Sequence, residues 1–333
     1  MDSPKMPKLN CDNPIFVYGC ARSGTSLLSR ILNSHPNISV PYESHLYNTF
    51  APWLKHYGDL NTEKNRLNLI NDMSTVLHDW TPNIDPIAAL NATTQYDFDG
   101  IIDGVMYSLA QKEGKSRWGD KSPWHVFYWK EIYKAFPNAK IIHIVRDGRD
   151  SSASWQKARF GPKHFLVLAE RWRDYLLTVD ECRAVIAPEN FLDIQYEEIL
   201  KDPELTIKKI CSFLGEEYSP EMLEFHKNKT PYPTDKTNLA NLTKPLMQDN
   251  AQKWKKNLTK DEIRIFEAIA KKQLEQYNYE VSNPQAHISA TAKFFIHYVT
   301  HPLLRLLSMS KNLKGQSDGF IKLSVYLKRR LSL

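Results

Sequence analysis

A loop near the start of the chain has the residue types of a phosphate-binding site. It runs from Gly19 to Gly24 between a short apolar run and a helix-like stretch, with Arg22 inside it. Backbone amides of such a loop and the amino end of the following helix converge on one anion. The glycine spacing matches a Walker A loop, but Thr25 stands where that loop has its lysine. The sequence therefore predicts a phosphate site that lacks the usual lysine of a nucleoside triphosphatase.

A second segment, IIHIVRDGRDSSAS, offers another anion site. Arg146 leaves an apolar strand and Ser154 follows in the next helix, so both side chains could bind a second phosphate. The strands expected after the loop end at Arg146 and Gln195, so none is expected to end in the aspartate that holds magnesium in P-loop enzymes. This pattern favours a group that carries less charge than a γ-phosphate, such as a sulfuryl group.

Together, GCARSGTSLL and VRDGRDSSAS resemble the 5′-phosphosulfate and 3′-phosphate motifs of sulfotransferases that use 3′-phosphoadenosine 5′-phosphosulfate (PAPS). The resemblance extends through RWGDKSPWHV and DIQYEEILKDPELTIKKICSFLG and covers roughly residues 14–277. The chain is most similar to the branch that contains tyrosylprotein sulfotransferases and microbial sulfotransferases. The resemblance implies a sulfotransferase with a P-loop-like α/β fold, PAPS as donor, 3′-phosphoadenosine 5′-phosphate as product, and no metal.

The same resemblance assigns the nucleotide contacts. The loop residues expected at the 5′-phosphosulfate are Gly19, Arg22, Ser23, Gly24, Thr25 and Ser26. Arg146 and Ser154 are expected at the 3′-phosphate, Tyr196 near the nucleotide, and Lys253 on a later loop that returns over the phosphates. The serine that the tyrosylprotein enzymes carry early in that loop falls on Asn238, and their second arginine falls near Lys157 or Arg159, so these contacts stay open.

Three residues are expected to carry the chemistry. Glu43 lies at the spacing from Arg22 at which tyrosylprotein sulfotransferases have their general base, which would take the proton of the acceptor hydroxyl. His45 is the rival base. Lys121, in GDKSP, matches the lysine that faces the sulfuryl group, and with Arg22 it would stabilise charge on the departing phosphate. A carboxylate serves as such a base if burial raises its pKa.

The acceptor is expected to carry a hydroxyl, which could belong to a peptide tyrosine, a sugar, a lipid or a small molecule. Trp124 and His125 follow Lys121 closely enough to border its pocket. Two other functions use a similar loop: a P-loop small-molecule kinase and a non-catalytic nucleotide-binding scaffold at a membrane. Thr25 argues against the kinase, and the presence of both Glu43 and Lys121 argues against the scaffold. No nucleic acid partner is expected, and a homodimer stays open.

The elements that must position these residues follow from the hydrophobic pattern. Strands are expected at 15–18, 139–145 and 191–195, each followed by a helix. This order predicts a three-layer α/β fold with a central, mainly parallel sheet flanked by helices. A long helix is expected over 163–186, and Thr259 with Glu262 forms a capping box that opens another helix.

We expect the chain to be divided into an extension (1–13), a sulfotransferase domain (14–283) and a basic amphipathic tail (284–333). Within the domain, residues 59–114 are predicted to be a helical insertion on the acceptor side, and residues 228–248 a lid loop.

The tail carries the excess positive charge of the chain, whose net charge is +6. From residue 285 onward there are eight Lys and Arg residues and one acid. FFIHYVTHPLLRLLSM and GFIKLSVYLKRRL combine apolar and basic residues, as interfacial helices do. We expect the tail to dock on an anionic membrane surface, or alternatively to pack on the body or pair two chains.

Composition adds limits on location and cofactors. The 333 residues are enough for one large globular domain. The four cysteines have no zinc-like spacing and indicate no disulfide framework, so neither a metal nor an oxidising compartment is expected. The start of the chain has no apolar leader and no run is long enough to span a bilayer, which predicts a cytoplasmic protein, peripheral to a membrane if the tail docks.

Overall fold

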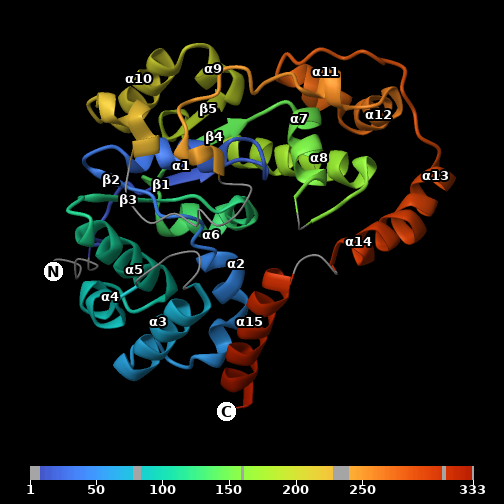
Figure 1. Cartoon of the computed structure of the whole chain (residues 1–333). Helices are drawn as coiled ribbons and strands as arrows, with labels where there is room; N and C mark the ends of the chain where they lie inside the picture. Colours follow the sequence, from blue (N-terminus) through green and yellow to red (C-terminus); the bar gives the residue numbers. More distant parts are fainter. Residues whose placement is uncertain (1–7, 78–83, 159–160, 228–239, 310–312, 332–333) are drawn as a thin grey trace.

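The structure is a computed structural model that describes residues 8–77, 84–158, 161–227, 240–309 and 313–331. Within these ranges the centre is a parallel sheet in the strand order β2-β3-β1-β4-β5 (Figure 1). The strands are β1 (Ile15–Tyr18), β2 (Ile38–Ser39), β3 (Arg117–Asp120), β4 (Lys140–Val145) and β5 (Phe191–Gln195). The three expected strands are confirmed, the second beginning one residue later than predicted, and β2 and β3 are additional.

β3 was not predicted from the sequence because its residues are RWGD, with two charged side chains and a glycine. All four are nevertheless buried, since the strand lies between β2 and β1. The cost of burying the Arg117 guanidinium is offset by its hydrogen bonds to the carbonyls of Asn13 and Leu214 and to Glu216. Asp120 ends this strand, so the expectation that no strand ends in an aspartate is wrong.

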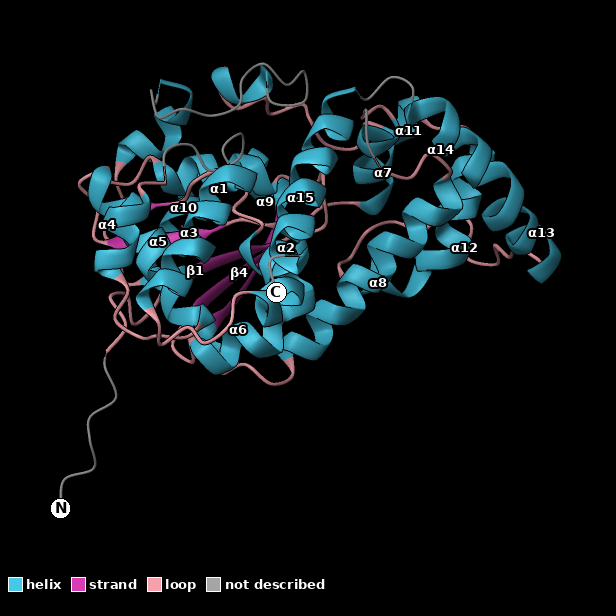
Figure 2. Cartoon of the chain, turned by 90° about the horizontal axis from the view of Figure 1, so that it is seen from below, coloured by secondary structure: helices cyan, strands magenta, loops and turns pink. Residues whose placement is uncertain are grey.

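Helices cover both faces of the sheet, because successive residues of a strand point to opposite sides. Ile15 and Val17 of β1 belong to one core, and Phe16 and Tyr18 to the other. The first core is closed by α1 (Thr25–Asn33), α9 (Tyr196–Lys201), α10 (Pro203–Leu214) and η4 (Pro220–Lys227). The second is closed mainly by α5 (Phe98–Lys112), α6 (Trp129–Ala135), α8 (Phe165–Arg183) and α12 (Lys260–Gln276). Figures 1 and 2 show these helical layers around the sheet, so the expected three-layer α/β fold is confirmed.

The stretch 59–114 is helical in its described part, where it forms α3 (Glu63–Leu77), α4 (Pro86–Ala92) and α5. The elements before it are α2 (Leu46–Phe50) and η1 (Ala51–His56). Its proposed role on the acceptor side, like the division of the chain into three parts, stays a prediction.

Further helices connect these layers. They are η2 (Pro123–Tyr128), α7 (Gly148–Gln156), η3 (Pro188–Asn190), η5 (Ala240–Thr243) and α11 (Trp254–Asn257), followed in the tail by α13 (Ala290–Phe295), η6 (Ile296–Thr300), α14 (His301–Met309) and α15 (Leu313–Leu331). The capping box at Thr259 and Glu262 is present at the start of α12. Among the residues that the structure describes, no helix is both long enough and apolar enough to cross a membrane.

A buried ion network fixes α7, the helix that follows the second anion motif, to α12. Arg149 is fully buried and pairs with Asp147 at 2.8 Å and with Glu267 of α12 at 2.7 Å. Its guanidinium also lies 3.6 Å from the ring centre of Trp254. Because removing one member leaves an uncompensated charge in the core, such a network is costly to break.

We expect Glu267→Ala to lower the free energy of unfolding by about 3–5 kcal/mol, because Arg149 would lose a buried partner. The control is Glu275→Ala on the same helix, where the pair with Lys271 is exposed and the expected loss is about 0.5 kcal/mol or less. Urea unfolding followed by circular dichroism measures both. Equal losses for the two variants would show that the buried network does not hold α7 to α12.

Candidate active site

The loop between β1 and α1 is tightly built at the carboxyl edge of the sheet. Gly24 has a φ of 92°, and a Cβ atom on it would lie 2.4 Å from Cδ2 of Tyr196. A Cβ on Gly19 would lie 2.5 Å from Cγ2 of Thr25. Arg22 also has a left-handed backbone, with φ 74°, which is uncommon for a residue other than glycine. Strain of this kind concentrates at ligand sites, so the loop geometry favours the predicted anion site.

A cavity of about 400 Å³ lies beside the loop. Eight of the ten residues predicted to contact the nucleotide line it: Arg22, Gly24, Thr25, Ser26, Arg146, Ser154, Tyr196 and Lys253. The other two shape the loop from beneath. The amide of Gly19 donates to the hydroxyl of Tyr175 at 2.7 Å, and the buried Ser23 hydroxyl lies 3.3 Å from that of Ser151. The structure thus brings residues from four separate segments to one cavity.

The cationic side of the cavity centres on Arg146. Its guanidinium lies 4.5 Å from the ring centre of Tyr196 and donates to the carbonyl of Asn250 at 2.7 Å. Its Nε is buried and has no hydrogen-bond partner. Ser154 lies nearby, where its hydroxyl accepts from Nε of Arg22 at 3.1 Å. An unsatisfied buried donor beside a cavity fits a ligand oxygen, as the 3′-phosphate prediction requires.

The later loop returns over this cavity as expected. Asp150 accepts from the amide of Trp254 at 2.7 Å, and the side chain of Asn250 donates to the hydroxyl of Tyr196 at 2.8 Å. Burial raises the pKa of Asp150 and opposes the effect of Arg146, 3.6 Å away. Lys253 therefore sits on a segment that is anchored on both sides, at Asn250 and at Trp254.

The predicted lid is described only in its second part. There, Leu242, Pro245, Leu246 and Met247 line the cavity. Residues 228–239, with Asn238, lie outside the described residues, as does Arg159. Lys157, the other position considered for the second family arginine, lines the cavity.

The three residues predicted for catalysis meet next to the loop. Lys121 is fully buried, and its Nζ lies 2.7 Å from Oε1 of Glu43 and 3.2 Å from the hydroxyl of Ser26. The other oxygen of Glu43 lies 3.0 Å from Nε2 of His45. Burial lowers the pKa of Arg22, and the nearby charge of Glu43 opposes that shift. A carboxylate, an ammonium group and the phosphate loop are thereby held in one cluster.

The electrostatics of this cluster differ from the expectation. Burial alone would raise the pKa of Glu43, but Lys121 and His45 together outweigh it and hold the pKa well below its usual range. The expected rise is therefore wrong for this arrangement. Burial lowers the pKa of Lys121, although the nearby Glu43 carboxylate opposes that shift. As the cluster stands, Glu43 is an ionised but weak base.

Asp120, at the end of β3, supports the cluster from behind. It accepts hydrogen bonds from the hydroxyls of Ser44 at 2.7 Å and Ser122 at 3.0 Å, and lies 2.7 Å from Nδ1 of His125. The hydroxyl of Ser122 accepts from the amide of His45, whose left-handed backbone has φ 52°. The turn with Glu43 is thus fixed to the segment with Lys121.

Two consequences follow for earlier expectations. His125 is 1% exposed and belongs to this support, whereas Trp124 is 47% exposed. That the two residues border an acceptor pocket stays a prediction. Asp120 was not recognised from the sequence, although its place directly before Lys121 in GDKSP could have drawn attention to it. Tyr175 and Asn250 gave no signal, because only the folded chain brings them to the loop and to Arg146. The described residues contain no cluster of metal-ligating side chains.

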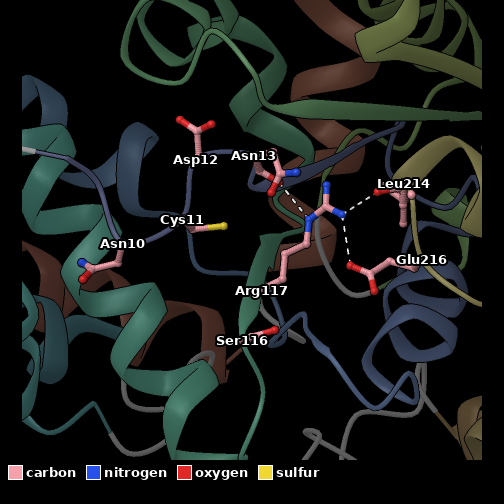
Figure 3. Close-up of a pocket in the computed structure, with 9 residues that line it drawn as sticks. Asn10, Cys11, Asp12, Asn13, Ser116, Arg117, Leu214 and Glu216 are labelled. Carbon is pink, nitrogen blue, oxygen red and sulfur yellow. Dashed lines mark hydrogen bonds and ion pairs between the residues drawn. The ribbon is translucent and has the colours of Figure 1, made fainter.

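A second cavity, of about 270 Å³, lies at the opposite edge of the sheet (Figure 3). Its lining includes residues that precede β1 and β3, such as Asn13 and Ser116, whereas the phosphate loop follows β1. Figure 3 shows Arg117 donating toward Asn13, Leu214 and Glu216. No predicted site residue lines this cavity, and its arginine ties β3 to the end of α10.

Comparison with known proteins gives a family match and several relatives. The model of the sulfotransferase family matches residues 14–220. A putative protein-tyrosine sulfotransferase of Caenorhabditis briggsae is 25% identical, over 66% of this chain and 71% of that protein. The protein-tyrosine sulfotransferase of Drosophila melanogaster is 23% identical, over 81% and 52% respectively. The omega-hydroxy-beta-dihydromenaquinone-9 sulfotransferase of Mycobacterium tuberculosis is 26% identical, over 70% of each chain.

Solved structures agree on the fold. A sulfotransferase domain from the curacin biosynthetic pathway has a TM-score of 0.57 at 18% identity and covers 81% of this chain and 98% of its own. The sulfotransferase domain of the Synechococcus PCC 7002 olefin synthase has a TM-score of 0.58 at 20% identity, with coverages of 84% and 99%. These similarities support the fold assignment.

We expect Lys121→Met to raise the pKa of Glu43, because burial then acts without its strongest opponent. A carbon-detected NMR titration of the side-chain carboxyl measures this, with circular dichroism as the check on folding. The control is Lys115→Met, which removes a similar partly buried ion pair with Glu113 at 3.1 Å and should leave Glu43 unchanged. An unchanged pKa in Lys121→Met would refute the electrostatic account.

Proposed function

The chain belongs to the sulfotransferase family, and we propose that it transfers a sulfuryl group from PAPS to a hydroxyl of its acceptor, with Glu43 as general base. The observation that carries this proposal is the position of Lys121. Its ammonium group lies between Ser26 of the phosphate loop and Glu43, so one cation faces both the donor site and the base.

The cavity offers one set of residues for each of the two anionic groups of the donor. The loop with Arg22, Ser23, Thr25 and Ser26, at the amino end of α1, would hold the 5′-phosphosulfate. In the proposed complex, Arg146 and Ser154 bind the 3′-phosphate, with Tyr196 and Lys253 beside them. The buried, unpartnered Nε of Arg146 supports this placement. PAPS would supply the sulfuryl group.

Each catalytic residue has one task in the transfer. Glu43 takes the proton as the acceptor oxygen forms its bond to sulfur, because a neutral alcohol is a poor nucleophile. The bond from sulfur to the bridging oxygen breaks, and its electron pair stays on the departing phosphate. Lys121 and Arg22 stabilise that charge in a site with little water, where electrostatic stabilisation is strong.

Donor binding would also adjust the base. The phosphosulfate offers Lys121 a new partner next to Ser26, 3.2 Å away, and so weakens its hold on Glu43. The pKa of Glu43 then rises toward the range in which a carboxylate accepts protons effectively. His45, 3.0 Å from the other carboxylate oxygen, orients Glu43 in this scheme and does not act as the base.

The acceptor is proposed as a hydroxyl compound. Relatives named above act, by their names, on protein tyrosine or on a hydroxylated menaquinone, and both are alcohols or phenols. Peripheral membrane contact through the tail, a homodimer and a cytoplasmic location remain predictions.

The kinase alternative is disfavoured by Thr25 and by Asp120, whose oxygens already accept from Ser44 and Ser122. The scaffold alternative is disfavoured by the joint presence of Glu43 and Lys121 beside the loop.

Calorimetric titration with 3′-phosphoadenosine 5′-phosphate, without magnesium, tests the donor. We expect tight binding, weakened about 10²-fold in Arg146→Ala because a buried charged contact is lost. The control is Arg173→Ala, whose partly exposed pair with Asp174 lies outside the cavity, and it should bind as the parent does. Binding of ATP with magnesium instead of the bisphosphate would favour the kinase.

Transfer from radiolabelled PAPS to a panel of phenols, sugars, tyrosine peptides and long-chain alcohols tests the base. We expect Glu43→Gln to lower kcat by about 10²–10⁴-fold with bisphosphate affinity within a few-fold, because proton removal is lost but the donor site remains. Glu113→Gln, also in an ion pair with a lysine, is the control. His45→Asn should cost far less, and the reverse order of the two losses would make His45 the base.

The pH dependence separates the same two residues. Because Glu43 has a lowered pKa before the donor binds, kcat/KM should hold as the pH falls toward 5, about half a unit above the unperturbed value of 4.5. The acid limb of kcat should lie at higher pH, since Lys121 is then drawn to the donor. A histidine base would instead reduce kcat/KM through the range where histidines titrate.

A further inference from the structure

The tail exposes an unusual amount of apolar surface. Large hydrophobic side chains with 57% or more of their area exposed gather on α13, η6, α14 and α15: Phe294, Phe295, Tyr298, Leu303, Leu306, Leu307, Phe320 and Leu331. In Figure 1, α13 and α14 form an arm at the side of the molecule, and α15 lies beside α2 and α3. Exposed apolar patches on this scale mark a surface that contacts another protein, a membrane or a ligand.

α15 has two distinct faces. Its inner face packs on the body: Val325 is 8% exposed, Tyr326 lies 5.4 Å from the ring of Trp53, and Arg329 pairs with Asp72 of α3. The inner face of α15 therefore packs on the body, as one of the alternatives for the tail expected. The outer face carries Phe320, Leu323, Leu327 and Leu331 at helical spacing, each 40% or more exposed. Docking on the body does not use these residues.

Basic residues flank the outer face of α15. Lys328 and Arg330 are exposed and lie on either side of its apolar stripe, if positions are taken at 100° per residue. Arg305 is exposed among the leucines of α14. The segment from residue 285 onward carries eight basic residues against one acid. An apolar stripe with flanking Lys and Arg is the pattern of a helix that lies in the surface of an anionic membrane.

The charge also decides against a second copy of the chain on this surface. A two-fold contact places the same patch on both partners, so two strongly positive tails would face each other. Like charges across an interface cost several kcal/mol. Anionic lipid headgroups offer the complementary charge, and acyl chains offer a place for the leucines and aromatic rings.

The same surface is attached to elements that adjoin the segments with the proposed catalytic groups. α15 packs on η1. η1 directly follows α2, and α2 begins at the residue after His45. The arm is held to α8 by the pair of His297 with Glu170 at 3.0 Å. α8 also carries Tyr175, whose hydroxyl accepts from the first glycine of the phosphate loop.

The segment that follows Lys121 in the chain exposes two aromatic rings. Trp124 and Phe127 of η2 are 47% and 48% exposed, and their ring centres lie 5.7 Å apart. Phe127 in turn lies 6.0 Å from Tyr175. Exposed aromatic rings offer apolar area to the hydrocarbon body of an amphiphile.

From these observations we propose that the outer faces of α14 and α15 seat the enzyme on an anionic membrane, from which it takes a lipid alcohol as acceptor. The choice of acceptor rests on the proposed sulfotransferase function, whereas the membrane contact does not. The lipid hydroxyl would reach Glu43 past Trp124 and Phe127 while its chain stays in the apolar layer.

Cosedimentation of the full chain with vesicles tests the contact. We expect at least about tenfold more protein to bind phosphatidylcholine vesicles with about 30% phosphatidylglycerol than vesicles of phosphatidylcholine alone, with loss at high salt. Leu303→Glu with Leu306→Glu should abolish this preference. The matched control, Val185→Glu with Leu205→Glu, changes two exposed residues outside the tail and should keep it.

Calorimetry with 3′-phosphoadenosine 5′-phosphate shows whether both double variants remain folded and able to bind the donor product. Vesicle binding without nucleotide binding would overturn the sulfotransferase proposal and leave the membrane contact standing. Equal sedimentation of the parent with both kinds of vesicle, or of the parent and the Leu303→Glu, Leu306→Glu variant with anionic vesicles, would overturn the contact. A parent dimer that this variant converts to monomer, without vesicle binding, would assign the surface to a second copy.

The acceptor is tested with hexadecanol in anionic vesicles and radiolabelled PAPS. We expect sulfation of the alcohol, reduced in the variant that no longer binds vesicles and retained in the control. Sulfation of a soluble tyrosine peptide by an enzyme that ignores hexadecanol would overturn the lipid acceptor.

Discussion

Burying an ammonium group costs several kcal/mol unless a partner of opposite charge and further hydrogen bonds compensate. The contact between Lys121 and Glu43 meets that requirement, and much of the surrounding structure serves to maintain it. Lys121 follows a strand of the central sheet, while Glu43 sits on a turn between β2 and α2, so the two must be aligned by something other than the sheet itself. Asp120 does this through its hydrogen bonds with Ser44 and Ser122. The pair thus ties the phosphate loop, through Ser26, to the turn that carries Glu43.

The clustering of the residues proposed to bind the donor was largely predictable because it is encoded locally. The residues from Gly19 to Ser26 are adjacent in sequence, and the contacts of Arg146 and Ser154 follow from one strand and one helix. The fold was predictable for the same reason, since β1 and β4 are largely apolar runs that bury both faces. β5, at the edge of the sheet, is a short run in which only Ile194 is fully buried. The strands that were missed, β2 and β3, are short or charged, and only their neighbours explain their burial.

The acceptor half was harder to predict because it depends on contacts between distant segments. The spacing of Glu43 from the loop could be taken from relatives, but its lowered pKa follows from the closeness of Lys121 and His45, which no sequence pattern gives. His125 illustrates the limit: its closeness to Lys121 in sequence suggested a pocket wall, and the fold places it in the interior beside Asp120. The tail was correctly seen as amphipathic, but which of its faces would dock on the body was not visible.

The position of Asp120 bears on how this scaffold could change its chemistry during evolution. A single substitution, lysine for Thr25, would restore a Walker A sequence, and β3 already ends in an acid beside β1. That acid is nevertheless committed to two serines and a histidine, so a lysine alone would create the motif without a carboxylate that could serve a nucleoside triphosphate. At least one further change, which releases Asp120, would have to occur in the same lineage. The intermediate would have lost the support of its proposed general base before it gained a new reaction, so this step would be selected against between two families of phosphate-binding enzymes.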